Sequence, residues 1–333
     1  MARVLVTGGA GYVGSVCAAQ LLAKGNHVEV VDDLSAGHRD AVPDGAIFHR
    51  FDISDRARLS TLLRTKSFDM VFHFAAKALI SESVSNPGVF FDSNVANGIS
   101  MLEALRAHGI RKFVFSSTAA VYGIPTVVPT PEEHVTEPVN AYGESKLMLE
   151  RILKWYASAY GWSVVAFRYF NACGGSDNWG ERHEPETHII PLLLQAASGR
   201  RPSFDIYGCD YPTSDGTCQR DYVHVLDIAD AHLLAMQKFE RGKFRAYNIG
   251  TGQSHSVKEV HEAAEKITGK RIEVRFLDRR PGDPPALCAS PQRLEEEFGW
   301  KPIRSNLHDI LTGAWKWEQH QSNRMLREIA ARP

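Results

Sequence analysis

A tyrosine and a lysine four residues apart carry the clearest catalytic signal in the sequence. Tyr142 and Lys146 lie at the start of a predicted helix over Ala141–Tyr160, where the i, i+4 spacing places both side chains on one face. A nearby ammonium group stabilises a phenolate, so we expect Lys146 to lower the pKa of Tyr142 from about 10 toward the working range. A tyrosine tuned in this way is a competent general base and acid for a sugar hydroxyl.

Three adjacent hydroxyl residues supply a partner for this pair. Ser116, Ser117 and Thr118 stand at the end of an apolar strand predicted over Lys112–Ser116. Ligands of doubly wound parallel sheets bind at the carboxyl ends of the strands, which is where these hydroxyls fall. We expect Thr118 to bridge Tyr142 and the reacting oxygen, with Ser117 as a helper.

A glycine-rich turn predicts a dinucleotide site. Gly8, Gly11 and Gly14 have the spacing G-x-x-G-x-x-G between an apolar run and an apolar helix. Glycine at these points permits a tight turn and a close approach of pyrophosphate to the backbone, and the free N–H groups of the helix attract phosphate. The next predicted strand ends in Asp32 and Asp33, where an acid binds the adenosine ribose and repels a 2′-phosphate. NAD is therefore favoured over NADP.

The elements that must position these residues alternate in a βαβ rhythm over the first 170 residues. This rhythm predicts an α/β fold with a Rossmann-like, doubly wound parallel sheet. We predict strands at Arg3–Thr7, His27–Asp32, Ala46–Arg50, Met70–His73, Lys112–Ser116 and Ser163–Arg168. The helices between them are predicted at Val13–Lys24, Asp55–Thr65, Gly88–His108 and Ala141–Tyr160.

Beyond Tyr169 the connections become longer and richer in glycine, proline and aspartate. This change predicts an NAD-binding lobe over residues 1–170 and a smaller mixed α/β substrate lobe over residues 171–333, with a chain that crosses between the two. Helices are predicted at His188–Ser198, Val225–Phe239, Val257–Thr268, Pro291–Phe298 and Leu307–His320, with strands at Arg245–Ile249 and Ile272–Phe276.

Composition limits the partners of the protein. Of 333 residues, 38 are Lys or Arg and 39 are Asp or Glu, so the net charge of -1 provides no field for nucleic acid or an anionic membrane. The five cysteines are scattered without a C-x-x-C pair or a nearby pair of histidines, which predicts neither a disulfide framework nor a metal site. No apolar run approaches the roughly 18 residues that a membrane span needs. We therefore expect a cytoplasmic enzyme that acts on small molecules.

Longer motifs around these residues resemble the extended short-chain dehydrogenase/reductase superfamily and, more narrowly, its UDP-glucose 4-epimerase family. The first half of the chain is similar at Gly8–Gly14, Val31–Leu34, His73–Ala76, Phe115–Gly123 and Tyr142–Met148. The second half contributes more specific motifs at Arg168–Asn171, Tyr207–Thr213, Asp215–Val225, Tyr247–Gly252 and Arg279–Asp283. The resemblance therefore covers nearly the whole chain.

This resemblance implies an isomerase that keeps NAD bound through every turnover and interconverts UDP-galactose and UDP-glucose. Tyr142 would take the proton of the sugar 4-hydroxyl while hydride leaves C4, and the 4-keto sugar would then turn in the pocket and take the hydride back. Lys146 would hold the nicotinamide ribose, and Thr118 would hydrogen-bond the 4-oxygen. Pairing of the helices Gly88–His108 and Ala141–Tyr160 across a two-fold axis would give a homodimer.

The resemblance also implies two sets of binding residues. A guanidinium fork suits a diphosphate, and Arg220 and Arg280 match the arginines that contact it in this family. The implied cofactor contacts are Gly8, Gly11, Tyr12, Val13, Gly14, Asp32, Asp33, Leu34, Ser35, Gly37, Asp52, Ile53, Phe74, Ala75, Ala76, Lys77, Asn94, Ser116, Ser117, Tyr142, Lys146 and Tyr169. The implied substrate contacts are Thr118, Tyr142, Asn171, His188, Ile189, Tyr207, Arg220, Arg280, Asp283 and Leu287. The role of Lys77 stays open, because some relatives carry the lysine one position later.

Alternatives to this interpretation differ in substrate or in class. Leu287 is intermediate in size between the tyrosine and the cysteine of relatives, so UDP-N-acetylglucosamine stays open as a substrate beside UDP-glucose. A uronate 4-epimerase and a nucleotide-sugar decarboxylase also stay open. A 4,6-dehydratase would need an acidic pair where this chain has Ala119 and Ala120. A noncatalytic NAD-binding regulator is the remote alternative, against which the presence of Tyr142 and Lys146 argues.

Overall fold

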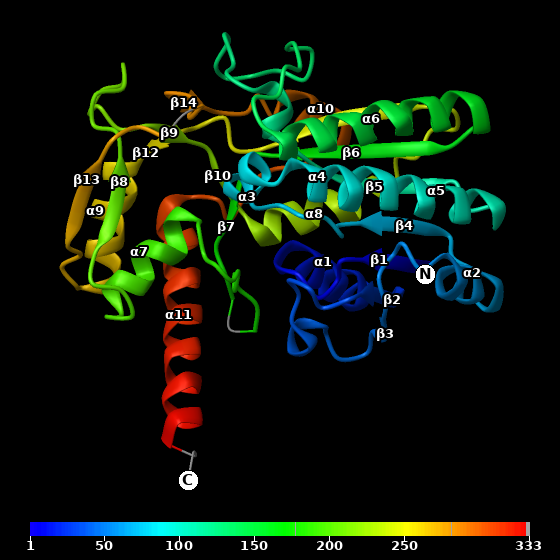
Figure 1. The fold of residues 1–333 in the computed structure, drawn as a ribbon, viewed down its shortest axis with the longest axis horizontal. Coiled ribbons are helices and arrows are strands. Elements are labelled where there is room, and N and C mark those ends of the chain that lie inside the picture. The colour runs from blue at the N-terminus through cyan, green and yellow to red at the C-terminus, as the bar shows by residue number, and fades with distance from the viewer. Residues whose placement is uncertain (177, 281, 331–333) are drawn as a thin grey trace.

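A parallel sheet of seven strands forms the centre of the larger lobe (Figure 1). The computed structural model describes residues 1–176, 178–280 and 282–330, with side chains as far as residue 324. The strand order is β3-β2-β1-β4-β5-β6-β11, with bounds β1 Arg3–Thr7, β2 His27–Asp32, β3 Ile47–Arg50, β4 Met70–His73, β5 Lys112–Thr118, β6 Ser163–Tyr169 and β11 Phe244–Ile249. The six strands predicted in the first half of the chain are therefore confirmed, with ends that differ by one or two residues at most.

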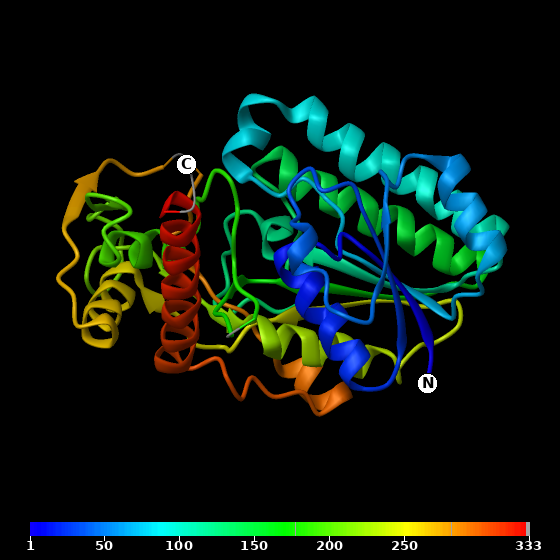
Figure 2. The same ribbon diagram turned by 90° about the horizontal axis from the view of Figure 1, so that it is seen from below.

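The pleat of each strand divides its side chains between two helical layers. Val4 and Val6 of β1 face one layer and Leu5 faces the other, and all three are fully buried. Figure 2 shows the two layers on opposite sides of the sheet. The first holds α1 (Tyr12–Ala23), α8 (Val225–Ala235) and α10 (Gln292–Phe298), and the second holds α2 (Arg56–Thr65), α5 (Asn97–Ala107) and α6 (Ala141–Tyr160). Burial on both faces explains why the central strands are largely apolar, whereas the edge strand β3 is partly exposed.

The strand order reverses beside β1, because β2 pairs on one side of it and β4 on the other. Every strand pair of this sheet is parallel, so the strands end along one edge. The crevice outside the carboxyl ends at such a reversal is where doubly wound sheets bind ligands. Thr7, His73 and Thr118 end β1, β4 and β5 and mark this edge.

The smaller lobe packs three helices against short strands. Its apolar side chains form a separate core that includes Leu193, Ile206 and Val260. The helices are α7 (Ile189–Ala197), α9 (Val257–Thr268) and α11 (Leu307–Ala330), and the strand pair is β8 (Phe204–Tyr207) with β13 (Val274–Leu277). Shorter pairs join β7 (Asn171–Cys173) to β10 (Tyr222–His224), and both β12 (His255–Ser256) and β14 (Ala286–Leu287) to β9 (Gln219–Arg220).

The chain crosses between the lobes more than once. After β6 it enters the smaller lobe, and it returns as α8 and β11, which complete a helical layer and the sheet of the larger lobe. The strand predicted over Arg245–Ile249 thus belongs to the main sheet, although it lies far beyond residue 170. Its buried Tyr247 and Ile249 find their apolar neighbours there, since Tyr247 pairs with Phe167 of β6.

The helix predicted over Gly88–His108 is confirmed as one continuous helical run from Pro87 to Ala107, with a π-helical stretch inside it that was not predicted. The structure has α3 (Ile80–Ser85), α4 (Pro87–Phe90), a π-helical turn η2 (Phe91–Ala96) and then α5. Pro87 ends the preceding helix because proline has no N–H, and it begins the next one well. The π-helical turn carries Asn94, a buried residue whose side chain hydrogen-bonds the backbone of Lys77 and the hydroxyl of Ser145.

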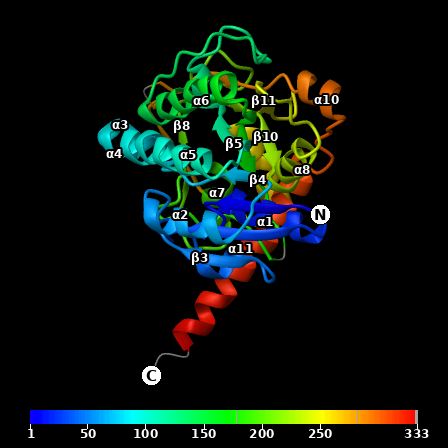
Figure 3. The same cartoon turned by 90° about the vertical axis from the view of Figure 1, so that its right-hand side faces the viewer.

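The other predicted helices and strands are present, although α8 ends four residues before the predicted end at Phe239. Helix α3 and the short strands β7, β8, β9, β10, β12 and β14 were not predicted. Two 3₁₀ turns, η1 (Arg39–Ala41) and η3 (Ala119–Tyr122), were not predicted. Helix α11 continues ten residues past the predicted end at His320 and projects from the body of the molecule (Figure 3). Among the described residues, no helix has both the length and the apolar character that crossing a membrane requires.

A buried ion pair ties β5, β6 and α6 together. Arg168 of β6 and Glu150 of α6 lie 2.6 Å apart between Nη2 and Oε2, with side chains 7% and 3% exposed. Ser117 of β5 donates its hydroxyl to the same carboxylate, and Arg168 donates to the Tyr122 hydroxyl at 2.9 Å. Tyr122 in turn donates to Asn248 of β11 at 2.7 Å. Each buried charge is therefore paired and hydrogen-bonded, as burial of ions requires.

Removal of this carboxylate should destabilise the protein strongly. In Glu150→Ala the guanidinium of Arg168 stays buried without its partner, which costs about 3–5 kcal/mol of unfolding free energy. Glu150→Gln is the matched control, because it keeps a hydrogen-bond acceptor and should lose less. Urea unfolding followed by circular dichroism measures the difference, and an unchanged midpoint for Glu150→Ala would mean that the buried pair does not stabilise the fold.

Candidate active site

One large pocket opens at the carboxyl edge of the sheet, lined by residues of both lobes. Its volume is about 1020 Å³, at the upper end of the range for ligand sites. The lining includes every residue predicted to contact cofactor or substrate except Leu34 and Asn94. The fold thus gathers at one place residues from Gly8, near the start of the chain, to Leu287, near its end.

The glycine loop packs too closely for side chains at two of its three positions. Gly8 has a φ of +74°, and a Cβ there would lie 2.3 Å from the nitrogen of Ala75. A Cβ on Gly14 would lie 2.2 Å from the oxygen of Gly8. Gly11 differs, because the nearest atom to its Cβ would be that oxygen at 3.4 Å. Gly11 also begins α1 without a side-chain cap, which leaves N–H groups of the first turn for a ligand.

Asp32 stabilises this loop through its carboxylate. Its Oδ2 accepts from the nitrogen of Ala10 at 3.0 Å, and its Oδ1 accepts from the nitrogen of Leu34 at 2.8 Å. Burial raises the pKa of Asp32, and the two backbone hydrogen bonds oppose the rise. Each oxygen keeps a second lone pair with which it can accept from a ribose hydroxyl. Leu34 lies outside the lining because its side chain packs on the core.

Strand β5 directs its hydroxyls to two sides. Ser116 and Thr118 share one face and Ser117 the other, because side chains alternate along a strand. The hydroxyl of Ser117 is bound to buried Glu150, so the prediction that Ser117 assists Tyr142 is wrong. Thr118 accepts from the nitrogen of Ala120 at 3.1 Å and hydrogen-bonds the Tyr142 phenol.

Tyr142 and Lys146 lie one turn apart at the start of α6. The Nζ of Lys146 lies 6.0 Å from the centre of the Tyr142 ring and donates to the carbonyl of Ser116 at 2.9 Å. The predicted fall in the Tyr142 pKa is wrong for the protein alone, because burial raises this pKa and the Thr118 hydrogen bond offsets only part of the rise. Burial also lowers the pKa of Lys146 to about 7, although the carboxylate of Glu150 acts to raise it. For each group, desolvation outweighs the interaction that opposes it, which is with Thr118 for Tyr142 and with Glu150 for Lys146.

Asn94 connects the loop before α3 to α6. Its Oδ1 accepts from the nitrogen of Lys77 at 2.8 Å, and its Nδ2 donates to the carbonyl of Lys77 at 3.0 Å and to the hydroxyl of Ser145 at 2.9 Å. The amide is thus engaged within the protein, which explains why Asn94 is absent from the pocket lining. It holds the backbone of Lys77, which does line the pocket, against the turn that carries Tyr142.

Two arginines of the smaller lobe lie beside other predicted substrate contacts. The Nη2 of Arg220 lies 3.2 Å from Oδ1 of Asp283, and its Nη1 donates to the carbonyl of Pro284 at 2.9 Å. The guanidinium carbon of Arg280 lies 3.7 Å from the centre of the Tyr207 ring, a cation–π contact. Both guanidinium groups are therefore held at the pocket by neighbours that an anionic ligand can replace or join.

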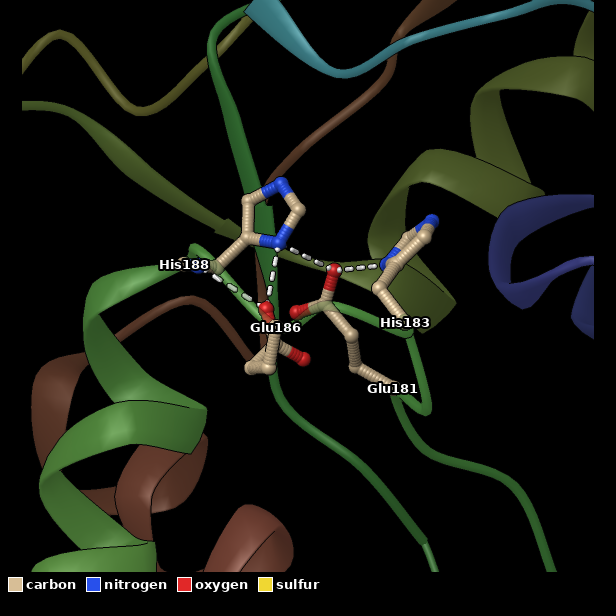
Figure 4. A group of neighbouring side chains, drawn as sticks. All are labelled: Glu181, His183, Glu186 and His188. Carbon is tan, nitrogen blue, oxygen red and sulfur yellow. Dashed lines mark hydrogen bonds and ion pairs between the residues drawn. The ribbon is translucent and has the colours of Figure 1, made fainter. Parts of the chain in front are cut away.

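The sequence analysis missed several lining residues. Glu181 and His183 precede His188 on the connection between β7 and α7 and form with it a charged cluster (Figure 4). Their signal is the close spacing of acids and histidines along the chain. The buried hydroxyl of Tyr222 has no hydrogen-bond partner among the described residues, which favours a ligand contact. Tyr222 has no sequence signal, because its place depends on the pairing of β10 with β7.

The larger lobe fits a dinucleotide. The backbone at Gly11 leaves space that a side chain would fill, and the uncapped end of α1 attracts phosphate. Asp32 stands at the end of β2 with lone pairs for a ribose, and its charge disfavours a 2′-phosphate. These are the features by which such folds hold NAD.

Comparisons with known proteins agree with this geometry. The NAD dependent epimerase/dehydratase family matches residues 4–250. The UDP-glucose 4-epimerase of Corynebacterium glutamicum is 46% identical over 313 residues, which cover 94% of each chain. The crystal structure of UDP-glucose 4-epimerase from Brucella ovis in complex with NAD is 41% identical, with a TM-score of 0.91 over 96% of this chain and 98% of that one. The enzyme from Bifidobacterium longum, solved with NAD+ and UDP, is 33% identical, with a TM-score of 0.92 over 96% and 99%.

Alanine substitution should separate the two roles of the glycine loop. Gly14→Ala creates a clash inside the protein and should lower its stability by about 1–3 kcal/mol. Gly11→Ala meets only a van der Waals contact and should leave the stability without ligand unchanged, while a similar clash with the pyrophosphate weakens NAD binding about 5- to 150-fold. Thermal unfolding and calorimetric titration with NAD measure the two effects. Equal NAD affinity for Gly11→Ala and wild type would place the pyrophosphate elsewhere.

Proposed function

The chain belongs to the NAD dependent epimerase/dehydratase family, and on that premise we propose that it is a UDP-glucose 4-epimerase that interconverts UDP-glucose and UDP-galactose. Its cofactor is NAD. The observation that carries the proposal is the meeting of Thr118, Tyr142 and Lys146 with Arg220 and Arg280 around one pocket. A tyrosine base on the larger lobe and guanidinium groups on the smaller lobe suit a sugar joined to a diphosphate.

Tyr142 is the general base and acid of the proposed reaction. Its phenol hydrogen-bonds Thr118, so both hydroxyls can engage the sugar 4-oxygen. When bound, NAD accepts a hydride from C4 of the sugar and later returns it. Since burial raises the pKa of Tyr142, the phenol holds its proton firmly in the free protein and releases it only when the ligands and Lys146 compensate the charge.

The smaller lobe is proposed to hold the UDP part of the substrate. Arg220 and Arg280 would take the diphosphate, Asp283 the uridine ribose and Tyr207 the uracil ring. Asn171, His188, Ile189 and Leu287 line the same pocket and complete the proposed contacts. Binding energy spent on the diphosphate leaves the sugar free to turn and present its other face.

The relatives favour UDP-glucose and UDP-galactose over other sugars in this proposal. The proteins similar to this chain include a UDP-Glc/GlcNAc 4-epimerase from Campylobacter jejuni, 33% identical, so N-acetylated hexoses are the second candidate substrates. Leu287 is the residue that decides between them in this proposal, because its side chain forms part of the wall. Galactose metabolism would be the setting of the reaction, and the cytoplasmic location stays a prediction.

We also propose a homodimer formed through α5 and α6. Both helices lie in the layer that also holds α2, and each carries an apolar side chain that faces solvent in the single chain. Trp155 of α6 is 75% exposed, and Ile99 of α5 is 36% exposed. Tryptophan is enriched at protein interfaces, and closed two-fold dimers are the commonest assembly.

The first test is conversion of UDP-galactose by purified protein without added NAD. Chromatography of the nucleotide sugars should show UDP-glucose at constant total sugar. Tyr142→Phe removes the transferable proton and should lower kcat about 100- to 10,000-fold, with its NAD content unchanged. The assignment fails if wild type converts nothing even with NAD supplied, or if Tyr142→Phe keeps the full rate.

A charge at position 155 should separate the dimer. Trp155→Glu places a carboxylate in the proposed apolar interface, where burial without a partner is costly. Light scattering at micromolar concentration should give the mass of two chains for wild type and for the control Trp155→Phe, and of one chain for Trp155→Glu. A single-chain mass for wild type would contradict the proposal.

A further inference from the structure

Four side chains from one short segment converge beside the pocket: Glu181, His183, Glu186 and His188 (Figure 4). Each offers one metal-ligating atom, and the four atoms lie within 4.8 Å of one another. The Nδ1 atom of His188 lies 2.9 Å from Oε1 of Glu181 and 2.8 Å from Oε1 of Glu186. The Nδ1 atom of His183 lies 2.9 Å from the same oxygen of Glu181. The four donors therefore already face a common point.

The two carboxylates of this cluster are buried and need positive charge. The side chains of Glu181 and Glu186 are 6% and 7% exposed. Within the part of the chain that the structure describes, their ion-pair partners are the two imidazoles and no arginine or lysine. The neighbouring Arg182 pairs with Asp40 instead. One divalent cation would neutralise both carboxylates and leave both imidazoles neutral, as metal ligands must be.

The donor set indicates which ion. Two imidazole nitrogens and two carboxylate oxygens are ligands for Zn²⁺ and related first-row ions, whereas Mg²⁺ and Ca²⁺ prefer oxygen alone. Around a tetrahedral Zn²⁺ at about 2.0–2.1 Å, neighbouring donor atoms lie about 3.3–3.4 Å apart. Three of the contacts, at 2.8–2.9 Å, lie within about 0.6 Å of that separation, and all four donor atoms lie within 4.8 Å of one another.

We propose that Glu181, His183, Glu186 and His188 bind a divalent transition-metal ion of the Zn²⁺ class. The ion would cross-link the connection between β7 and α7, whose described residues form neither helix nor strand, to the start of α7. No cysteine takes part, which explains why the search for cysteine motifs predicts no metal. The sequence signal of this site is instead the spacing E-x-H-x-x-E-x-H.

Metal binding would also determine how His188 meets a ligand. With Nδ1 on the metal, the proton of the neutral ring stays on Nε2 and makes that atom a donor. Figure 4 shows this second nitrogen pointing away from the carboxylates. The consequence that Nε2 donates to the UDP-sugar rests on the proposed function, whereas the metal site itself does not.

The test uses the NAD-loaded protein without an affinity tag. After incubation with ZnCl₂ and desalting, mass spectrometry of the metal should find one Zn²⁺ per chain. Competition with a chromophoric chelator should show at least about 10- to 100-fold weaker binding for Glu181→Gln and for His183→Gln. His308→Gln removes an exposed histidine elsewhere and should bind like wild type. Co²⁺ in place of Zn²⁺ should give the visible bands of a four-coordinate site in wild type and lose them in both variants.

The proposal is overturned if wild type retains no Zn²⁺, or if both variants bind it as tightly as wild type. The carboxylates would then be neutralised by protons on the two imidazoles. Circular dichroism and NAD content verify folding, and His183→Gln decides alone if Glu181→Gln does not fold, because His183 is the more exposed of the two. Epimerase activity measured in parallel separates the conclusions. Activity without metal binding would overturn the metal site but not the proposed function. Metal binding without activity would overturn the proposed function but not the metal site.

Discussion

The buried pair between Arg168 and Glu150 is the interaction on which the geometry of the site depends. It joins β6 to α6, and the hydroxyl of Ser117 joins β5 to the same carboxylate. Thr118 follows Ser117 on β5, while Tyr142 and Lys146 lie earlier on the helix that carries Glu150. One compensated pair of buried charges thus fixes the strand and the helix from which the proposed catalytic side chains project. Such a pair is held by its hydrogen bonds rather than by its charge alone.

Burial sets the protonation of the site. Desolvation raises the pKa of Tyr142 and lowers that of Lys146 to about 7, so burial disfavours the charged form of each group. The carboxylate of Glu150 acts to raise the pKa of Lys146. Glu150 therefore influences the charge of the site as well as the position of its helix. A pocket that disfavours charge on its own groups makes their ionisation depend on the charges that the ligands bring.

The smaller lobe contributes charge where the larger lobe contributes hydroxyls. Arg220 and Arg280 are held by an acid and an aromatic ring, and the acids at 181 and 186 are held by two histidines. These groups lie on connections and short strands, which the pairing of β7 with β10 and of β9 with β14 keeps beside the sheet. This difference between the lobes follows from the fold, because the edge of a parallel sheet is rigid, whereas the connections between elements can carry varied charged residues.

The sequence by itself determined the strands of the sheet and the dinucleotide turn, and it predicted the catalytic roles of Thr118, Tyr142 and Lys146, which line one pocket. These follow from local rules: apolar continuity for buried strands, glycine spacing for the turn and a helical period for the pair. Only the tertiary structure decided that Ser117 binds Glu150 rather than Tyr142, that Asn94 holds Lys77 from a π turn, and that β11 returns to the main sheet. It also reversed the expected pKa of Tyr142. Each of these depends on burial or on partners distant in the chain, which no local pattern specifies.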